Sequence, residues 1–136
     1  GIAHDDYVPR SVAAAIAHAN DKTSFVALIE TAEGIENVEA IAALPGCDCL
    51  WIGHFDLSNS LGIPGAFEDP LFTSSTRRVM EAAQANGKSV GRLVGTVEDA
   101  DRCIAEGCDF ICYSGDVWLY RDAVHQGLSA IRDRRG

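Results

Sequence analysis

The sequence predicts an α/β fold made of repeated strand–helix units with parallel strands. Short continuous apolar runs alternate with segments in which apolar residues recur every three or four positions. Continuous apolar runs are typical of parallel strands that helices cover. A weak internal repeat points the same way, because residues 46–53 and 107–115 both pass from glycine through Cys-Asp into an apolar run. In each copy we expect a helix to end at glycine before a strand, as in a βα-repeat protein.

The first half of the chain is expected to form two strands and two helices. The Ala-rich segment 11–19 predicts a helix, and the apolar run at 25–29 predicts a strand buried on both faces. Apolar residues at helical spacing predict a single helix over 34–44, which the following Pro-Gly pair would end. A second strand is expected over 49–52.

The second half continues the alternation after a long polar loop at 53–68, which contains glycine and proline breakers. Asp69 and Pro70 are typical of a helix start, as N-cap and first helical residue, and this helix would end near residue 85. The remaining expected elements are a strand at 89–94, a helix at 96–106, a strand at 110–113 and a helix at 116–134.

Length and composition indicate a single domain that covers residues 1–136. The residues alone leave two architectures open. One is a small doubly wound sheet, and the other is half of a (βα)₈ barrel, which typically needs about 250 residues. No glycine-rich phosphate loop follows any expected strand, which weakens a nucleotide-binding interpretation.

Charge and composition argue against several classes of function. The formal net charge is −9, whereas nucleic-acid binding needs a positive surface. Charged residues interrupt every apolar run, so we expect no transmembrane helix and no membrane partner. The cysteines show no CxxC spacing, and buried reduced thiols in a cytoplasmic protein are the expected state. They are Cys47, Cys49, Cys103, Cys108 and Cys112.

Two carboxylates follow the first two expected strands. Glu30 comes directly after the run at 25–29, and Asp56 comes shortly after the run at 49–52. If these runs are parallel strands joined by one helix, both carboxylates emerge at the edge where ligands bind in α/β folds. Two acidic ligands with room for water and substrate suit a hard divalent cation such as Mg²⁺ or Mn²⁺.

The segments that carry these carboxylates resemble the HpcH/HpaI aldolase family. Residues 29–37 read IETAEGIEN, and residues 50–62 read LWIGHFDLSNSLG. The family pattern is roughly IET-x-x-G-x-x-N, then a strand, then IG-x-x-DLS-x-S-LG. Members are class II, metal-dependent 2-oxo acid aldolases of the phosphoenolpyruvate/pyruvate-barrel group. The strand–helix alternation continues beyond these motifs, so the resemblance covers nearly the whole chain.

The resemblance implies the C-terminal half of a TIM (βα)₈ barrel, about four βα units, and a carbon–carbon lyase. The expected reaction is reversible aldol cleavage of a 4-hydroxy-2-oxo acid to pyruvate, or a related 2-oxo acid, and an aldehyde. Glu30 and Asp56 would bind Mg²⁺ or Mn²⁺, with Co²⁺ as an alternative. The candidate substrate-binding residues are Gly53, Phe55, Asp56 and Leu93, with backbone N–H groups of Phe55 and Asp56 on the pyruvate carboxylate. A homo-oligomer is expected, formed through the C-terminal helix and the open barrel edges.

The sequence departs from the family pattern in ways that bear on the chemistry. Many members have glutamine where this chain has Leu28, and proline where it has His54. The chain matches only the part of the family after the first four strands. Those strands carry the arginine that polarises the 2-oxo oxygen and the histidine associated with proton transfer, and nothing here obviously replaces them.

Several further side chains have two readings. His54 is the candidate catalytic base, although the matching family position contributes mainly backbone; His4 is a candidate for a substrate contact or a supporting role. Arg92 would either bind a substrate carboxylate or, as we expect, pair with an Asp or Glu at the barrel end. Ser58 and Ser60 are expected to fix their loop by hydrogen bonds to the backbone.

Two rival functions remain. A lyase of the same barrel group that acts on an acyl-CoA, such as citryl- or malyl-CoA, would keep the carboxylate pair. A catalytically inactive half-barrel would serve only for oligomerisation or binding. A Schiff-base aldolase is disfavoured, because the two lysines, Lys22 and Lys88, precede strands.

Overall fold

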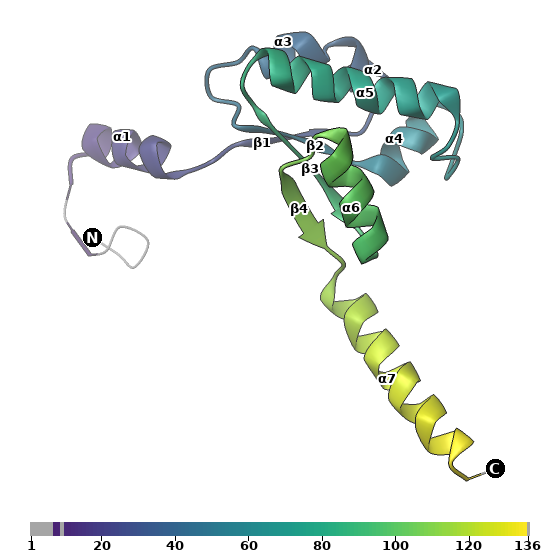
Figure 1. Ribbon diagram of the computed structural model, residues 1–136. Helices are drawn as coiled ribbons and strands as arrows, with labels where there is room; N and C mark the ends of the chain where they lie inside the picture. Colours follow the sequence, from purple (N-terminus) through teal and green to yellow (C-terminus); the bar gives the residue numbers. More distant parts are fainter. Residues whose placement is uncertain (1–6, 9, 136) are drawn as a thin grey trace.

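The structure, a computed structural model, describes residues 7–8 and 10–135 and contains one parallel sheet (Figure 1). Its strands lie in the order β1-β2-β3-β4, which is also their order in the sequence. They are β1 (Val26–Ile29), β2 (Cys49–Ile52), β3 (Ser89–Val94) and β4 (Phe110–Tyr113). A doubly wound sheet reverses its strand order at a switch point, and this sheet does not. Of the two predicted architectures, the consecutive order selects the barrel type.

Four helices cover one face of the sheet. They are α2 (Ala32–Glu36), α3 (Val38–Ala42), α5 (Pro70–Ala85) and α6 (Val97–Glu106). The helix α5 packs on α3, β2 and β3, and α6 packs on β3. Alternate strand residues point into this layer and form the core with helix side chains such as Val38, Val79 and Cys103. These strand residues are Ala27, Ile29, Leu50, Ile52, Val90 and Val94.

The other face of the sheet has no covering layer within the described residues. Val26, Leu28 and Phe110 on this face are 38%, 52% and 46% exposed. The prediction that the first strand is buried on both faces is therefore wrong, since β1 alternates between exposed and buried residues. The physical reason is that helices cover only the face that carries Ala27 and Ile29.

Helices at both ends of the chain project from this body (Figure 1). They are α1 (Val12–Lys22) and α7 (Asp116–Asp133), and neither contains a buried residue. Both nevertheless carry large exposed apolar side chains, including Ile16 in α1 and Trp118 in α7. No helix in the described part of the chain combines the length and apolar character needed to cross a membrane.

Two predicted elements need correction. The expected single helix over 34–44 is two short helices, because Asn37 (φ −104°, ψ 8°) ends α2 and begins α3. The expected long loop at 53–68 contains helix α4 (His54–Ser60). Gly53 is its N-cap and Leu57 is fully buried. The helix was not predicted because the segment is mostly polar and Leu57 is its main buried apolar residue.

The internal repeat has a shared structural role. Asp48, before β2, accepts a hydrogen bond from the Phe25 N–H through Oδ2 at 2.8 Å. Asp109, before β4, accepts one from the Val90 N–H through Oδ1 at 2.9 Å. Each aspartate thus ties the start of its strand to the neighbouring strand. The expectation that a helix ends at glycine holds for Gly107, which caps α6, but is wrong for Gly46, because α3 ends earlier.

The cysteines are free thiols, as predicted. Four of them are buried and Cys112 is exposed. Their contribution to the core is exemplified by Cys47 and Cys103, which are almost completely excluded from solvent.

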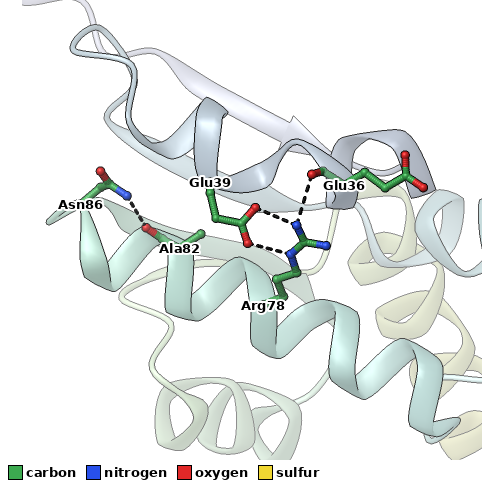
Figure 2. Close-up of polar contacts among 5 residues, drawn as sticks. All are labelled: Glu36, Glu39, Arg78, Ala82 and Asn86. Carbon is green, nitrogen blue, oxygen red and sulfur yellow. Dashed lines mark hydrogen bonds and ion pairs between the residues drawn. The ribbon is translucent and has the colours of Figure 1, made fainter.

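A bidentate ion pair joins α3 to α5 (Figure 2). Arg78 donates from Nε and Nη2 to the two carboxylate oxygens of Glu39, at 2.7 and 2.8 Å, and Nη2 also donates to the Glu36 carbonyl oxygen at 3.2 Å. The hydrogen bond from Arg78 is the main reason that the pKa of Glu39 falls to about 2. The contribution of this pair to stability is present above the ordinary glutamate pKa and is lost as the pH falls toward 2.

Replacing Arg78 with Gln is expected to raise the pKa of Glu39 toward the ordinary value of 4.5, because the charge-assisted hydrogen bonds are lost. An NMR titration of the glutamate side-chain carbons measures this. The matched control is Arg77→Gln, since Arg77 is an exposed neighbour outside the pair. A Glu39 pKa that stays low in Arg78→Gln would show that the guanidinium is not the cause.

Candidate functional site

Glu30 lies at the carboxyl end of β1, directly against Gly53. A Cβ atom placed on Gly53 would lie 2.8 Å from Glu30 Cβ, 3.1 Å from Glu30 Oε2 and 3.2 Å from Leu28 Cδ1. The Gly53 N–H also donates to the Ile29 carbonyl oxygen at 3.1 Å. Glycine at this position therefore lets the Glu30 side chain lie over the end of β2, on the open face of the sheet.

Asp56 lies in the first turn of α4, three positions after the N-cap Gly53. The Leu57 N–H donates to the Gly53 carbonyl oxygen at 2.8 Å, which closes this turn. No side chain caps the helix, so the leading N–H groups, those of Phe55 and Asp56 among them, have no intrahelical acceptor. The structure thus places Glu30 against Gly53 and Asp56 in the helical turn that follows Gly53, both beyond the carboxyl ends of neighbouring strands.

Serine side chains hold α4 in this position. Ser58 is completely buried, donates to the Phe55 carbonyl oxygen at 2.7 Å and accepts from the Gly65 N–H at 3.0 Å. Ser60 accepts from the Ala32 N–H at 3.0 Å, which joins the end of α4 to the start of α2. Both serines therefore act through hydrogen bonds to the backbone, as the sequence predicts.

The other candidate residues divide between the two faces of the sheet. Leu93 points to the opposite face from Arg92 and shares the open face with Gly91. A Cβ atom placed on Gly91 would lie 2.7 Å from the Trp51 ring. His54 is half-buried and packs against the rings of Phe55 and Phe67, with centroids at 4.5 and 5.4 Å. Burial, and secondly the charge of Arg92, lower the pKa of His54, so its imidazole is neutral at pH 7. His4 lies outside the described residues.

The sequence-based expectation for Arg92 is wrong. Arg92 forms no ion pair within the described residues, and its buried Nε has no hydrogen-bond partner. Arg92 is two residues away from both Val90 and Val94, which lie in the core, so it shares their face of the sheet. It therefore faces the helices, away from Glu30. The two-residue period of the strand could have shown which face Arg92 occupies, because Val90 and Val94 on the same face are typical core residues.

The donor set at Gly53 fits a divalent cation. Glu30 is half-buried and Asp56 is exposed, and they follow the carboxyl ends of the neighbouring strands β1 and β2. Among residues 7–8 and 10–135, no group of three or more His, Cys, Asp and Glu side chains gathers to hold a metal ion. Two protein ligands leave positions for water and substrate oxygens, which suits Mg²⁺, an ion that usually keeps several waters.

Gly53→Ala is expected to weaken Mn²⁺ binding by about tenfold or more, as loss of a supporting contact around a metal ligand typically does. The added methyl would displace Glu30, while the backbone of α4 could remain in place. Calorimetric titration measures the affinity. Gly46→Ala is the control, because no atom lies within 4 Å of its added Cβ. Equal affinity in the two variants would show that contact between residues 30 and 53 does not position a ligand.

Comparison with known proteins identifies relatives over most of the chain. The sequence profile of the HpcH/HpaI aldolase/citrate lyase family matches residues 6–123. The chain is 35% identical over 114 residues to the hydroxypyruvate/pyruvate aldolase of Chromohalobacter salexigens, covering 84% of this chain and 45% of that protein. It is 32% identical over 116 residues to the 5-keto-4-deoxy-D-glucarate aldolase of Shigella boydii serotype 18, covering 85% and 45%.

Comparison with solved structures identifies the same family. The crystal structure of an HpcH/HpaI aldolase from Desulfitobacterium hafniense DCB-2 superposes with a TM-score of 0.82 at 27% identity. The superposition covers 97% of this chain and 52% of that one. The chain therefore spans about half the length of the relatives that it matches.

Proposed function

The chain belongs to the HpcH/HpaI aldolase/citrate lyase family, and from this premise we propose that it takes part in metal-dependent aldol cleavage. Its four parallel strands are half of a TIM-type barrel. The proposed reaction is the reversible cleavage of a 4-hydroxy-2-oxo acid to pyruvate, or a related 2-oxo acid, and an aldehyde. The observation that carries this proposal is the position of Glu30 against Gly53, with Asp56 in the turn that follows.

The residues of this chain would have the following roles in the reaction. Glu30 and Asp56 would hold the divalent cation, which, when bound, acts as a Lewis acid on the 2-oxo group. The free N–H groups of Phe55 and Asp56 donate to the substrate carboxylate and orient it. Leu93 and Leu28 on the open face provide apolar surface beside the substrate.

Proton transfer at the 4-hydroxyl group requires a base. His54 is the candidate in this chain, because its lowered pKa leaves the imidazole uncharged and able to accept a proton near pH 7. His54 is the first residue of α4 and packs against Phe67, so the substrate hydroxyl would have to lie near the start of that helix. No lysine competes for a covalent role, since Lys22 and Lys88 lie near the starts of β1 and β3, at the opposite edge of the sheet.

The relatives have about twice the length of this chain, so turnover is proposed for a complete barrel. Two alternatives follow from the same observations. The family profile includes citrate lyases, which favours carbon–carbon cleavage of an acyl-CoA, such as citryl- or malyl-CoA, as the second candidate. The half-length match favours a binding or oligomerisation module without turnover as the third.

Pyruvate release from 4-hydroxy-2-oxo acids, measured beside carbon–carbon cleavage of citryl- or malyl-CoA on protein of verified mass, separates these functions. We expect pyruvate release, its suppression by EDTA and its recovery with Mn²⁺ or Mg²⁺. Borohydride added with substrate should trap no adduct, because no lysine lies at the mouth. A trapped adduct would replace the metal-dependent reaction with an imine mechanism, and cleavage of citryl- or malyl-CoA alone would favour the second candidate.

A further inference from the structure

A cavity on the helix-covered side of the sheet contains a charged side chain, Arg92, that has no role in the proposed reaction. It has a volume of about 570 Å³ and lies beside the carboxyl end of β3, bordered by α4, α5, α6 and the start of α7. Its lining includes Arg92, His54, Phe67, Phe72 and Asp99. We propose that this cavity, here called the Arg92 cavity, binds a monoanionic organic carboxylate with an apolar body, with the guanidinium of Arg92 on the carboxylate.

The first argument is the state of Arg92. Its Nε is buried without a partner, and none of its guanidinium nitrogens forms a hydrogen bond or ion pair within the described residues. The nearby carboxylate of Asp99 is already engaged by Arg102. A buried donor without a partner is costly, whereas a carboxylate matches the fork of guanidinium donors with two parallel hydrogen bonds.

The second argument is the aromatic part of the cavity lining. The ring of Phe67 lies with its centroid 5.4 Å from Phe72, 5.3 Å from Phe55 and 5.4 Å from His54. These rings are packed edge to face, so they form a fixed apolar surface. The cavity volume is also within the range of sites for small organic molecules and far larger than a single inorganic ion requires.

The charges around the cavity favour a ligand that carries a single negative charge. Two of the lining carboxylates, Asp99 and Asp122, are paired with Arg102 and Arg121. Glu68 and Glu106 are in no ion pair within the described residues, so Arg92 faces an excess of negative charge. A phosphate dianion would be repelled by this surface, whereas a monocarboxylate with an apolar body meets both the guanidinium and the rings.

The cavity shares His54, Phe55 and Leu93 with the proposed active site, but the side chain of Arg92 does not face the proposed metal centre. Arg92 faces the helices, and Glu30 lies on the open face of the sheet. The proposal therefore does not depend on aldolase activity, and binding to the purified protein tests it directly.

The probe is 4-fluorobenzoate, followed by ¹⁹F NMR line broadening in a titration of the full chain. We expect saturable binding that Arg92→Leu weakens by about tenfold or more, because charged hydrogen bonds are lost. Arg92→Gln should weaken it similarly and provides a second variant if the leucine variant does not fold. The matched control is Arg132→Leu in α7, an exposed residue outside the cavity, which should leave binding unchanged.

Two ligand controls define the chemistry. The neutral analogue 4-fluorobenzamide should bind at least about tenfold more weakly, and inorganic phosphate should not displace the benzoate. The proposal is overturned if no saturable binding occurs, if both Arg92 variants bind 4-fluorobenzoate as the native chain does, or if the benzamide binds equally. Displacement by phosphate at the same concentration would overturn the selection for a monoanion.

Discussion

Glu30→Gln and Asp56→Asn are each expected to abolish Mn²⁺ binding and, with it, any aldol cleavage, while the fold is retained. Each change removes one of two anionic ligands and leaves a neutral amide of nearly the same shape. Since side chains around metal ligands alone can change affinity by 10–100-fold, loss of a ligand should cost more than about 100-fold. Mn²⁺ calorimetry and circular dichroism on the same samples measure affinity and fold.

The controls repeat the same chemical changes at positions away from Gly53. Glu33→Gln in α2 and Asp101→Asn in α6 alter exposed carboxylates and should leave Mn²⁺ affinity unchanged. Unchanged affinity in both ligand variants would remove the metal-site interpretation. Equal loss in the controls would attribute binding to the net charge of −9 rather than to a defined site.

The positions of the metal-ligand candidates follow from the sequence more directly than the packing does. Two apolar runs joined by helical segments predict parallel strands, and parallel strands bring Glu30 and Asp56 to one edge. The sequence does not show that Glu30 lies over Gly53, because that contact depends on the register in which Ile29 pairs with Ile52.

Elements with mixed local signals were harder to predict. The polar segment after Gly53 was expected to be a loop, and its helix depends on the tertiary burial of Leu57 and Ser58. Asn37 divides the helix predicted over 34–44, since its side chain donates to the Glu33 carbonyl oxygen at 2.8 Å and competes with a continuous helix. Arg92 shows the limit most clearly. Its face follows from strand periodicity, but the cavity around it is formed by four helices that no local pattern brings together.

The open face and the projecting helices lead to an expectation about assembly. Leu28 and Phe110 lie on a sheet face without a covering layer in the described residues, and β1 and β4 are edge strands there. Helix α7 carries exposed Val117, Trp118, Leu119, Tyr120, Val124, Leu128 and Ile131 along its length. Trp118 and Tyr120 are thus exposed in this chain, which favours a role for both as interface anchors.

We therefore predict that the 136-residue chain is not a stable monomer. Either it is part of a protein that supplies the remaining strands, or copies associate through the open face and α7. Sedimentation velocity should show dimers or larger assemblies of the isolated chain. Tyr120→Glu and Leu128→Glu should shift them toward smaller species, because a buried charge opposes an apolar interface. Leu44→Glu, at an exposed apolar residue after α3, is the matched control and should have no effect.

A compact monomer with cooperative unfolding would contradict this expectation. In that state the apolar face beside Glu30 would be closed by α1 or α7 folding back, since edge strands and a sheet face of this kind rarely stay exposed to water. The same measurement therefore bears on function. An assembly through the open face would enclose the edge that holds Glu30 and Asp56, and closing an active site strengthens the electrostatic interactions inside it. A monomer closed by its own helix would cover the substrate side of Leu93 and leave no room for turnover.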